Sequence, residues 1–576
     1  MNLARHPNMP LAAKPIRNNY LCLILHVQYV NMPYNDNVYK LYEEVFNMID
    51  CWKNEDFYME KENMMPRMIK CFQDVDCVEE LLNRKPACIS FKTTSTAIFT
   101  KKGAYVVLDF GKELCGSIRI VCRATKSRPA MFRITLGESL SEACSSIGEK
   151  NATNDHSPRD FTAAISDMSD LSFGMSGFRF ARIELLTEES VTIRNIYAVN
   201  FLPKFEKEGY ITTSDAELNK IIDTAIYTLK LNFQNGYIWD GIKRDRLVWS
   251  GDLNQEIISS IYLFGDNRNI TNSLDFLREE TPTTDWINLI PTYSAWWVIN
   301  LCDHCRLTGN KDYFEHNKDY AKSIMSRLNA SITEDGKMNL SLNASMPFFF
   351  DWPTYGTPDA IVGTATILMY AAKLLLEIEE NEDCHAIIRK LSPYLDEPCQ
   401  FKQTRAFQIL AGRSAKGDKE FLEAGGAKGF STFMSYYILS ADSKVNGSEM
   451  LSIIKEYFGA MLSRGATTFW EDFHMEWLDG SGQIDEFPKE GQKDIHGDYG
   501  DFCYKGFRHS LCHGWASGVL AFIYEFMLGL KLSDGGELFE VTPHTLGLEE
   551  IHAKIPTKNG WLVIDVINDK VSISHF

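Results

Sequence analysis

One stretch decides the fold of this chain: Ser214-Asp-Ala-Glu217, followed by apolar residues at Leu218, Ile221, Ile222, Ala225, Ile226 and Leu229. Serine followed three residues later by glutamate is a capping-box pattern, which marks the beginning of a helix. The apolar residues then recur with the spacing of one helix face. The chain therefore changes here from strand-like patterns to a long helical region.

The region before this stretch, residues 86–204, is predicted to be a β-sandwich. Its short runs alternate between apolar and polar residues or are continuously apolar, and Gly, Ser, Asp and Lys separate them. Several strands without intervening helices favour an antiparallel sandwich. The runs lie at 104–110, 116–122, 131–136, 178–186 and 191–199. Residues 1–85 show no clear periodicity apart from a helix expected around 38–52, so the structure of this N-terminal segment stays open.

Residues 205–534 are predicted to form a toroid of helical hairpins. About a dozen helices in pairs are expected, with Gly, Asn and Asp between them. After the first helix, the patterns lie at 254–264, 270–278, 293–307, 312–328, 359–378, 384–395, 400–411, 428–439, 450–462 and 509–530. A helical-repeat solenoid is the alternative, although the sequence has no self-similarity at a fixed period of roughly 34–45 residues.

Residues 535–576 return to strand patterns and are predicted to form a small C-terminal β domain. Apolar runs lie at 538–542, 561–566 and 571–574, and Thr557-Lys-Asn-Gly560 is a hairpin signal. The chain is therefore expected to be multidomain, with a β-sandwich, a helical toroid and a small β domain in that order.

Composition and charge exclude several classes of partner and cofactor. A net charge of −18 disfavours nucleic acid and anionic membrane surfaces, which need a basic face. No run of about 18 apolar residues is present to span a membrane. The 14 cysteines are scattered, and the Cys302–Cys305 pair lacks the second pair that a zinc knuckle needs, so we expect no metal. An apolar run at 21–27 lacks a cleavage site, so we expect a cytoplasmic protein, with a periplasmic or secreted location left open.

A dense group of charges lies at residues 240–252, which read Asp-Gly-Ile-Lys-Arg-Asp-Arg-Leu-Val-Trp-Ser-Gly-Asp. It falls between two predicted helices and so on a loop, where functional residues concentrate. A solvated loop with salt bridges is the simplest interpretation of such a run. The interleaved Ile242, Val248 and Trp249 argue against full solvation, and carboxylates beside aromatic residues favour a site. Because carboxylates grip hydroxyls and exchange protons, we interpret the run as one wall of a saccharide site.

A second group lies at residues 465–472, which read Gly-Ala-Thr-Thr-Phe-Trp-Glu-Asp. Glu471 stands between an indole and another acid, where it can be held ionised as a base or kept protonated as an acid. An acid at a helix N-terminus is the competing interpretation.

Weaker candidates come from three other segments. Ser510-Leu-Cys-His513 places His513 at the opening turn of an apolar helix, where a hydrogen-bonded core histidine is the commoner outcome. Phe350-Asp-Trp352 sets Asp351 beside an indole, and the aromatic segment 291–297 ends at Trp297. Packing explains Trp297, Asp351 and Trp352 as well as binding does.

Several chemistries lack their sequence motif. The chain contains no GxGxxG after a strand, no P-loop, no GxSxG and no HExxH. Carboxylates remain as the best-placed reagents, and glycoside cleavage needs little beyond two of them.

From about residue 86 onward the chain resembles the family 78 glycoside hydrolases, the α-L-rhamnosidases. The resemblance rests on the motifs at 109–116, 137–138, 151–160, 240–252, 465–471 and 510–513. It implies an (α/α)6 barrel flanked by β domains. It also implies an inverting mechanism that uses a pair of carboxyl groups roughly 6.5–9.5 Å apart and neither a metal nor an organic cofactor.

The resemblance assigns roles to single residues. Glu471 falls on the general base and Asp245 on the general acid. The sugar-binding positions fall on Asp240, Arg244, Trp249, Asp252 and His513.

The chain departs from the family at Asp245, where most members have glutamate, and at Ile242, where they have proline. An aspartate is one methylene shorter, so its oxygens reach roughly 1.5 Å less. Glu256, just downstream, is the fallback acid.

The leading hypothesis is an inverting exo-glycoside hydrolase that removes terminal α-L-rhamnosyl or similar residues from an oligosaccharide or glycoside. The departure at Asp245 keeps open a catalytically impaired carbohydrate-binding protein. A helical toroid also keeps open another polysaccharide-degrading activity, such as a lyase or an unsaturated-uronyl hydrolase. The assembly state stays open, with a homodimer among the options.

Overall fold

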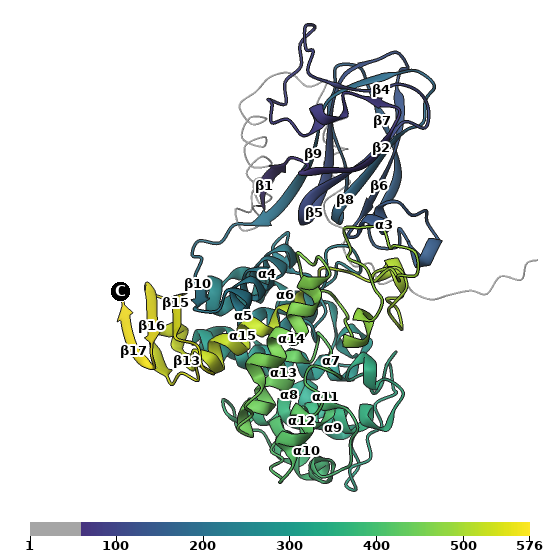
Figure 1. Ribbon diagram of the computed structural model, residues 1–576. Coiled ribbons are helices and arrows are strands. Elements are labelled where there is room, and N and C mark those ends of the chain that lie inside the picture. The colour runs from purple at the N-terminus through teal and green to yellow at the C-terminus, as the bar shows by residue number, and fades with distance from the viewer. Residues whose placement is uncertain (1–58) are drawn as a thin grey trace, which may run out of the picture. The chain divides into compact units, whose positions relative to one another are not determined.

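The computed structural model describes residues 59–576, which form a β domain, a helical domain and a C-terminal sheet (Figure 1). The helix expected around 38–52 and the apolar run at 21–27 lie outside the described residues. The predicted order along the chain, a β domain, a helical domain and a small C-terminal β region, is confirmed.

The β domain is built from nine antiparallel strands. The strands are β1 (Met59–Met64), β2 (Met68–Gln73), β3 (Val75–Asp76), β4 (Ala97–Phe99), β5 (Tyr105–Thr125), β6 (Ala130–Gly137), β7 (Asp160–Ile165), β8 (Asp170–Leu185) and β9 (Val191–Pro203). Along β5 the neighbour on one side changes from β2 to β9, close to a register shift between Asp109 and Leu114, while β8 stays on the other side. The apolar faces enclose a core that includes Phe99, Phe110 and Phe132.

The β domain begins earlier than residue 86, where the sequence placed its start. Strands β1, β2 and β3 belong to the same sheet, with β1 paired to β9 and β2 paired to β5. The sequence concealed them because β1 reads Met-Glu-Lys-Glu-Asn-Met and is mostly exposed, so it has no apolar alternation. Paired backbone, rather than buried side chains, holds these strands in the sheet.

The helical domain is a closed ring, which excludes the solenoid. Helices α5, α7, α9, α11, α13 and α15 contact one another in that order, and α15 returns to α5. Their bounds are α5 (Leu253–Phe264), α7 (Pro291–Thr308), α9 (Pro358–Leu376), α11 (Lys402–Leu410), α13 (Ser435–Lys444) and α15 (Val519–Phe522). The outer helices are α4 (Ala216–Asn232), α6 (Arg268–Glu280), α8 (Lys311–Ala330), α10 (Glu382–Leu391), α12 (Asp418–Glu423) and α14 (Met450–Ser463).

Burial explains the two layers. Helix α7 is buried on all faces except at Arg306, as expected for a helix with neighbours on every side. Helix α10 buries only Cys384, Ile387, Lys390 and Leu391 and exposes its charged face. Among the described helices, α9 is long and apolar enough to cross a membrane by length and composition, but 72% of its most apolar window is buried in the ring.

The helix predicted at 509–530 is much shorter in the structure. Residues up to His513 are extended or in turns, a 3-10 segment covers Gly514–Gly518, and only α15 and a π-helical turn at Ile523–Met527 follow. Gly514 and Gly518 give the segment low helix propensity, and polar contacts of residues 509–513 hold it open. His513 is therefore not on the opening turn of a helix.

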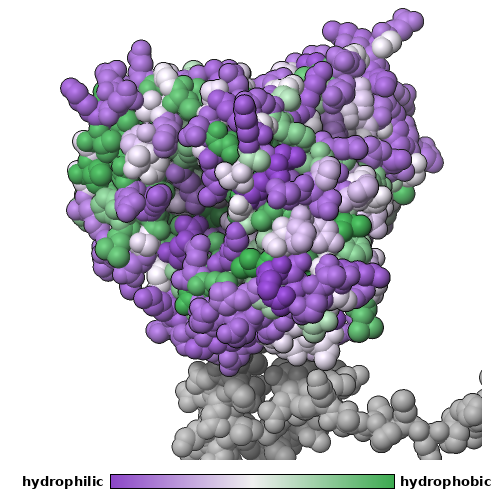
Figure 2. Space-filling view, turned by 90° about the horizontal axis from the view of Figure 1, so that it is seen from below, coloured by the Kyte–Doolittle hydropathy of each residue, from purple (hydrophilic) through white to green (hydrophobic). Residues whose placement is uncertain are grey.

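The C-terminal region forms two small sheets beside the ring (Figure 1). One has the order β10 (Tyr210–Thr213), β15 (Glu550–Pro556), β16 (Trp561–Ile567) and β17 (Lys570–His575), and the other pairs β13 (Leu530–Ser533) with β14 (Leu538–Val541). Strand β10 comes from the segment before α4, so this sheet joins both ends of the helical domain. The face of the molecule seen in Figure 2 is mostly hydrophilic with small hydrophobic patches, in keeping with the high charge.

Candidate active site

The loop of residues 240–252 connects β12 (Tyr237–Ile238) to α5 and folds back on itself. The Asp240 N–H donates to the Leu247 carbonyl (3.0 Å), and the Leu247 N–H donates to Asp240 Oδ1 (2.9 Å). The Gly514 N–H donates to the Asp240 carbonyl (2.7 Å), which ties the loop to the segment around His513. The run is thus a packed structure rather than a solvated loop.

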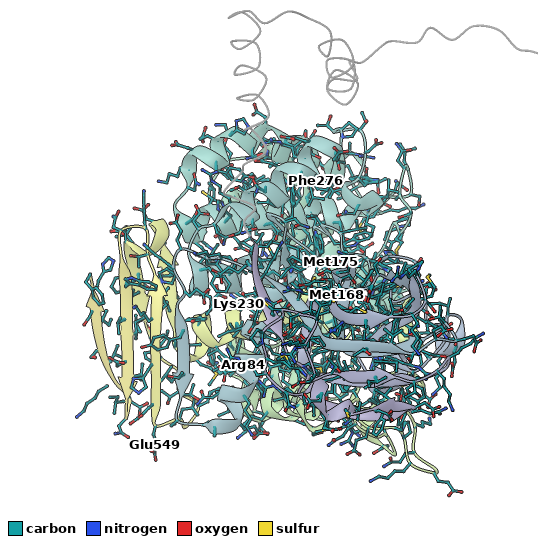
Figure 3. The ribbon with its side chains drawn as sticks, turned by 90° about the horizontal axis from the view of Figure 1, so that it is seen from above. Arg84, Met168, Met175, Lys230, Phe276 and Glu549 are labelled. Carbon is teal, nitrogen blue, oxygen red and sulfur yellow. The ribbon has the colours of Figure 1, made fainter. Side chains whose placement is uncertain are left out.

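Asp245 and Arg246 occupy the tip of this loop in the left-handed region, with φ of 55° and 58°. Successive non-glycine residues in this conformation are costly and concentrate at functional sites, although aspartate tolerates it better than most residues. The Arg246 guanidinium lies over the Trp239 ring and donates to the Met175 carbonyl of β8 (3.0 Å). Met175 is labelled in Figure 3, near the border between the β domain and the helical domain.

Arg244 brings the two candidate catalytic carboxyl groups together. Its Nη1 lies 3.1 Å from Asp245 Oδ1, while its Nη2 and Nε donate to the two oxygens of Glu471. Asp245 and Glu471 are far apart in the sequence, and the fold brings both to one guanidinium. The Asp245 side chain keeps 16% of its surface exposed, whereas Glu471 is buried.

The backbone around Glu471 is held by the segment that carries His513. The Glu471 N–H donates to the Ser510 carbonyl (3.0 Å), and the Ser510 N–H donates to Glu471 Oε2 (3.2 Å). The Trp515 indole N–H donates to the Glu471 carbonyl (2.9 Å). These contacts place the carboxylate without a helix around it, so the alternative of a helix N-terminal acid does not apply.

Asp252, His513 and Tyr293 form a buried polar wall beside this pair. His513 Nε2 lies 3.2 Å from Asp252 Oδ1, and the Tyr293 hydroxyl donates to Asp252 Oδ2 (3.3 Å). Burial raises the pKa of Asp252 to about 8 and lowers the pKa of His513 well below its usual value. Burial, reinforced by Asp245 and Asp252, also holds the pKa of Asp240 well above its usual value. At neutral pH this wall therefore favours uncharged groups that can donate and accept hydrogen bonds.

Trp249 completes the wall. Its ring meets Tyr293 edge to face, with centroids 5.8 Å apart. Among residues 59–576, the buried Trp249 Nε1 and His513 Nδ1 have no hydrogen-bond partner. Many other buried side-chain atoms in the described residues also have no partner, but these two line the candidate site, where the hydroxyl groups of a ligand could bond to them.

Asp351 and Trp352 reach the same cluster from the segment before α9. The buried Asp351 accepts from the Ser431 hydroxyl (2.6 Å), and burial raises its pKa to about 7. The Trp352 ring packs against Tyr504 (5.7 Å between centroids), and the Tyr504 ring lies 5.8 Å from the Arg244 guanidinium. Both residues are therefore neighbours of the candidate site.

Trp297 is not brought together with the other candidates. It is fully buried on α7, donates its indole N–H to the Leu274 carbonyl (3.0 Å) and packs edge to face on Tyr320 of α8. Its contacts are those of a core residue between the two helix layers.

We expect Trp297→Ala to lower the free energy of unfolding by about 3–5 kcal/mol, the usual cost of removing a large buried aromatic side chain. Urea denaturation followed by fluorescence measures this loss. The fraction that stays folded should bind substrate as the wild type does. A KM raised tenfold or more without loss of stability would instead show that Trp297 binds substrate.

Glu256 lies one helical turn beyond Asp252 and is fully buried. Its carboxyl packs so closely on Gly514 that a Cβ there would lie 1.4 Å from Glu256 Oε1, which explains the glycine. Burial raises the pKa of Glu256 well above its usual value. The Asp245 side chain is partly exposed, as a proton donor to substrate must be, and Glu256 is not.

Sequence reasoning missed residues that the β domain contributes. His156 Nδ1 lies 3.4 Å from Asp245 Oδ1, and Glu138 accepts from the Leu511 N–H (2.6 Å). Both lie in motifs that the sequence singled out, at 151–160 and 137–138, but only the fold shows which loop they meet. A small pocket lies at this junction, lined by Thr153, Asp155, Ser157, Lys243, Arg244, Phe507 and Arg508.

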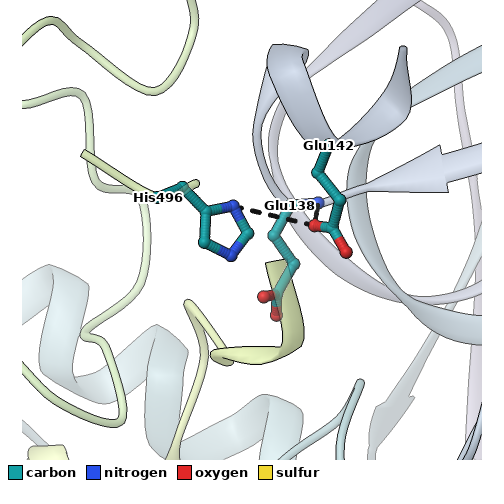
Figure 4. A group of neighbouring side chains, drawn as sticks. All are labelled: Glu138, Glu142 and His496. Carbon is teal, nitrogen blue, oxygen red and sulfur yellow. Dashed lines mark hydrogen bonds and ion pairs between the residues drawn. The ribbon is translucent and has the colours of Figure 1, made fainter. Parts of the chain in front are cut away.

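Within residues 59–576, one group has the side chains and spacing that could hold a metal ion. One ligand atom from each of Glu138, Glu142 and His496 lies within 4.8 Å of the others (Figure 4). Lys243 Nζ, however, lies 2.9 Å from Glu138 and 3.2 Å from Glu142. An ammonium group already pairs with both carboxyl groups, so the residues do not favour a metal.

One part of the chain matches a known family of domains. Residues 206–355, which run from just before α4 to just before α9, match the bacterial alpha-L-rhamnosidase 6 hairpin glycosidase domain. The chain therefore resembles the α-L-rhamnosidases of glycoside hydrolase family 78. This agrees with the helical ring and with the predicted resemblance.

The chain is also similar to part of a longer protein. It is 25% identical over 268 residues to an alpha-L-rhamnosidase of Alteromonas sp. (strain LOR), an alignment that covers 43% of this chain and 27% of that protein. It therefore aligns with only about a quarter of the length of that relative.

Solved structures share its fold. The GH78 family rhamnosidase of Bacillus sp. GL1 superposes with a TM-score of 0.66 at 17% identity, over 85% of this chain and 53% of the other. A rhamnosidase from Klebsiella oxytoca with rhamnose bound superposes with a TM-score of 0.60 at 17% identity, over 83% of this chain and 98% of the other. At these identities the likeness establishes the fold of the β domain and the ring.

Proposed function

We propose that this protein is an inverting exo-glycoside hydrolase that removes terminal α-L-rhamnosyl residues. The observation that carries the proposal is the bridge that Arg244 makes between Asp245 and Glu471 at one end of a glycosidase ring. Inverting hydrolysis needs two carboxyl groups on opposite sides of one sugar, roughly 6.5–9.5 Å apart. The choice of rhamnose as the sugar comes from the similar proteins, which are described as rhamnosidases. One of them has rhamnose bound.

In this proposal Asp245 is the general acid and Glu471 the general base. Asp245 donates a proton to the glycosidic oxygen as the bond to the anomeric carbon breaks, and Glu471 takes a proton from the water that attacks the opposite face. Charge-assisted hydrogen bonds from Arg244 and from the Ser510 N–H favour the ionised carboxylate of Glu471. Asp245 is the partly exposed member of the pair, so a leaving group can approach it.

The remaining wall binds the sugar. Asp252 and His513, held uncharged by burial, exchange hydrogen bonds with hydroxyls, and the Trp249 N–H is a further donor. The Trp249 and Trp352 rings offer apolar faces. A site of this kind orients one terminal residue.

The stereochemistry of hydrolysis tests the proposal. With 4-nitrophenyl α-L-rhamnopyranoside, we expect release of nitrophenol, and proton NMR of the first product should show the β anomer of L-rhamnose before mutarotation. Tight rhamnose binding by calorimetry without turnover would instead indicate a carbohydrate-binding protein. First release of the α anomer would contradict the inverting mechanism, and an unsaturated product absorbing in the ultraviolet would indicate a lyase.

A further inference from the structure

We propose that Glu138 of the β domain is a positioning residue for Glu471, acting through the Ser510–Leu511 peptide with Lys243 as its counter-ion. The inference rests on the proposed function, since it concerns the general base of that reaction. On this inference, the β domain contributes a residue to the active site in addition to packing against the helical ring.

Two consecutive N–H groups connect the two glutamates. The Ser510 N–H donates to Glu471 Oε2 (3.2 Å), and the next N–H along the chain, that of Leu511, donates to Glu138 Oε2 (2.6 Å). The Ser510 hydroxyl also donates to Glu138 Oε1 (3.3 Å). The two N–H groups flank the α-carbon of Ser510, so holding one peptide plane restricts the orientation of the other. Glu138 therefore orients the donor that holds Glu471.

Lys243 locks the same segment from the 240–252 loop. Its ammonium pairs with Glu138 and Glu142 and donates to the Phe507 carbonyl (3.0 Å) and the His509 carbonyl (2.6 Å). Glu138, Glu142 and Lys243 are buried, so their charges depend on one another. One cation thus joins the β domain, the loop that bears Asp245 and the segment that supports Glu471.

His496 closes the cluster without offering a free ligand atom. Its Nδ1 shares a hydrogen bond with the Ser139 hydroxyl (2.8 Å), and its Nε2 shares one with the His509 carbonyl (2.9 Å). Both ring nitrogens are engaged, and Figure 4 shows the ring beside Glu142. The cluster is therefore an ion-paired joint that holds residues 507–511.

The β domain also grips the loop that carries Glu471. The Arg179 guanidinium, paired with Asp109, donates to the Gly465 carbonyl (3.1 Å), and the Glu113 N–H donates to the Thr467 hydroxyl (2.9 Å). These contacts hold the start of the loop, while Glu138 holds the Ser510–Leu511 segment that donates to the Glu471 carboxylate. The domain contacts both supports of the base.

Removing the Glu138 carboxylate leaves the Leu511 N–H and part of the Lys243 charge buried without a partner, so residues 507–511 must shift. A misplacement of about 1 Å in a catalytic group costs on the order of a hundredfold in rate. The proposed sugar contacts at Asp252, Trp249 and His513 do not involve Glu138. We therefore expect kcat to fall while KM stays nearly constant.

The experiment compares three substitutions of Glu138 with a matched control. For Glu138→Ala we expect kcat for the aryl rhamnoside to fall on the order of a hundredfold with KM within about twofold. Glu138→Gln keeps an acceptor for the Leu511 N–H and should restore most of that loss. Asp418→Asn is the control, because Asp418 is also a buried carboxylate with two arginine partners, Arg405 and Arg413, but it lies on α12. It should lower the Tm and leave kcat unchanged.

The outcomes separate the possibilities. Wild-type kcat in folded Glu138→Ala overturns the inference, and so does an equal loss of kcat in Asp418→Asn, which would show a general effect of stability. If Glu138→Ala does not fold, Glu138→Asp replaces it. The aspartate keeps the negative charge but is one methylene shorter, so kcat should still fall. A wild-type kcat in this variant overturns the inference. Glu471→Gln is measured in parallel. Full activity of Glu471→Gln would refute the proposed function. If Glu471→Gln is inactive but the Glu138 variants keep the wild-type kcat, only the positioning role of Glu138 is refuted.

Discussion

Glu471→Gln should lower kcat for aryl α-L-rhamnoside hydrolysis on the order of 10³-fold, within the usual range for loss of a general base. Glutamine fills the same volume and keeps an oxygen that can accept from the Ser510 N–H. It cannot take a proton from water, so the loss appears in kcat, with KM changed by little. Steady-state kinetics of the purified variant measures both.

Azide gives this prediction a chemical control. In Glu471→Ala the carboxylate is gone, and azide, a small anion that needs no base, can attack the anomeric carbon in place of activated water. We expect azide to restore turnover and to yield the β-rhamnosyl azide of inverted configuration. Asp472→Asn is the matched substitution at the adjacent buried acid, and we expect its kcat to stay within about tenfold of wild type. A larger loss in Asp472→Asn than in Glu471→Gln would move the base to Asp472.

The helices and strands that form the layers of the fold were predictable because the spacing of apolar residues is visible within each segment of sequence. The pattern Leu218, Ile221, Ile222, Ala225 and Leu229 becomes the buried face of α4, as its spacing predicts. Strand β1 has no such pattern, since its pairing to β9 uses backbone groups and its side chains are mostly exposed. The sequence therefore predicts where the apolar faces lie, but it gives no signal for exposed strands such as β1.

The site was predictable only where one segment contains it. The loop with Asp240, Arg244 and Asp252 is a single run, and its density of charge marks it without a structure. That Arg244 reaches Glu471 depends on the closure of the ring. Glu138 and His156 belong to another domain, and a lone acid or histidine in a strand pattern has no feature that points to a distant loop.

His513 shows a different limit. The apolar run after it suggested a helix, but the histidine is extended, with φ of −138°, and pairs with Gly241. Polar contacts across the site therefore decide this conformation, and local propensity does not. Such tertiary control is expected at functional sites, where local patterns and the global fold disagree most often.

Asp245→Asn should lower kcat for an unactivated rhamnosyl disaccharide on the order of 10³-fold, because the departing alcohol then leaves without a proton donor. For 4-nitrophenyl rhamnoside, whose leaving group is a weak base, the loss should be at least tenfold smaller. This dependence on the leaving group distinguishes an acid from a residue that only binds sugar. Equal losses on both substrates would assign Asp245 to binding.

Asp245→Glu decides whether the departure from the family's glutamate is an impairment. The aspartate sits in a left-handed turn with φ of 55°, its oxygen lies 3.1 Å from Arg244 Nη1, and His156 approaches from the β domain. A glutamate would extend its oxygens by roughly 1.5 Å into Arg244 and His156. If the loop is adapted to aspartate, Asp245→Glu should lower kcat about tenfold or more, since misplacement on this scale is costly. A rise in kcat would instead show that the chain has lost its acid, and the pocket would then be one that binds rhamnosides better than it cleaves them.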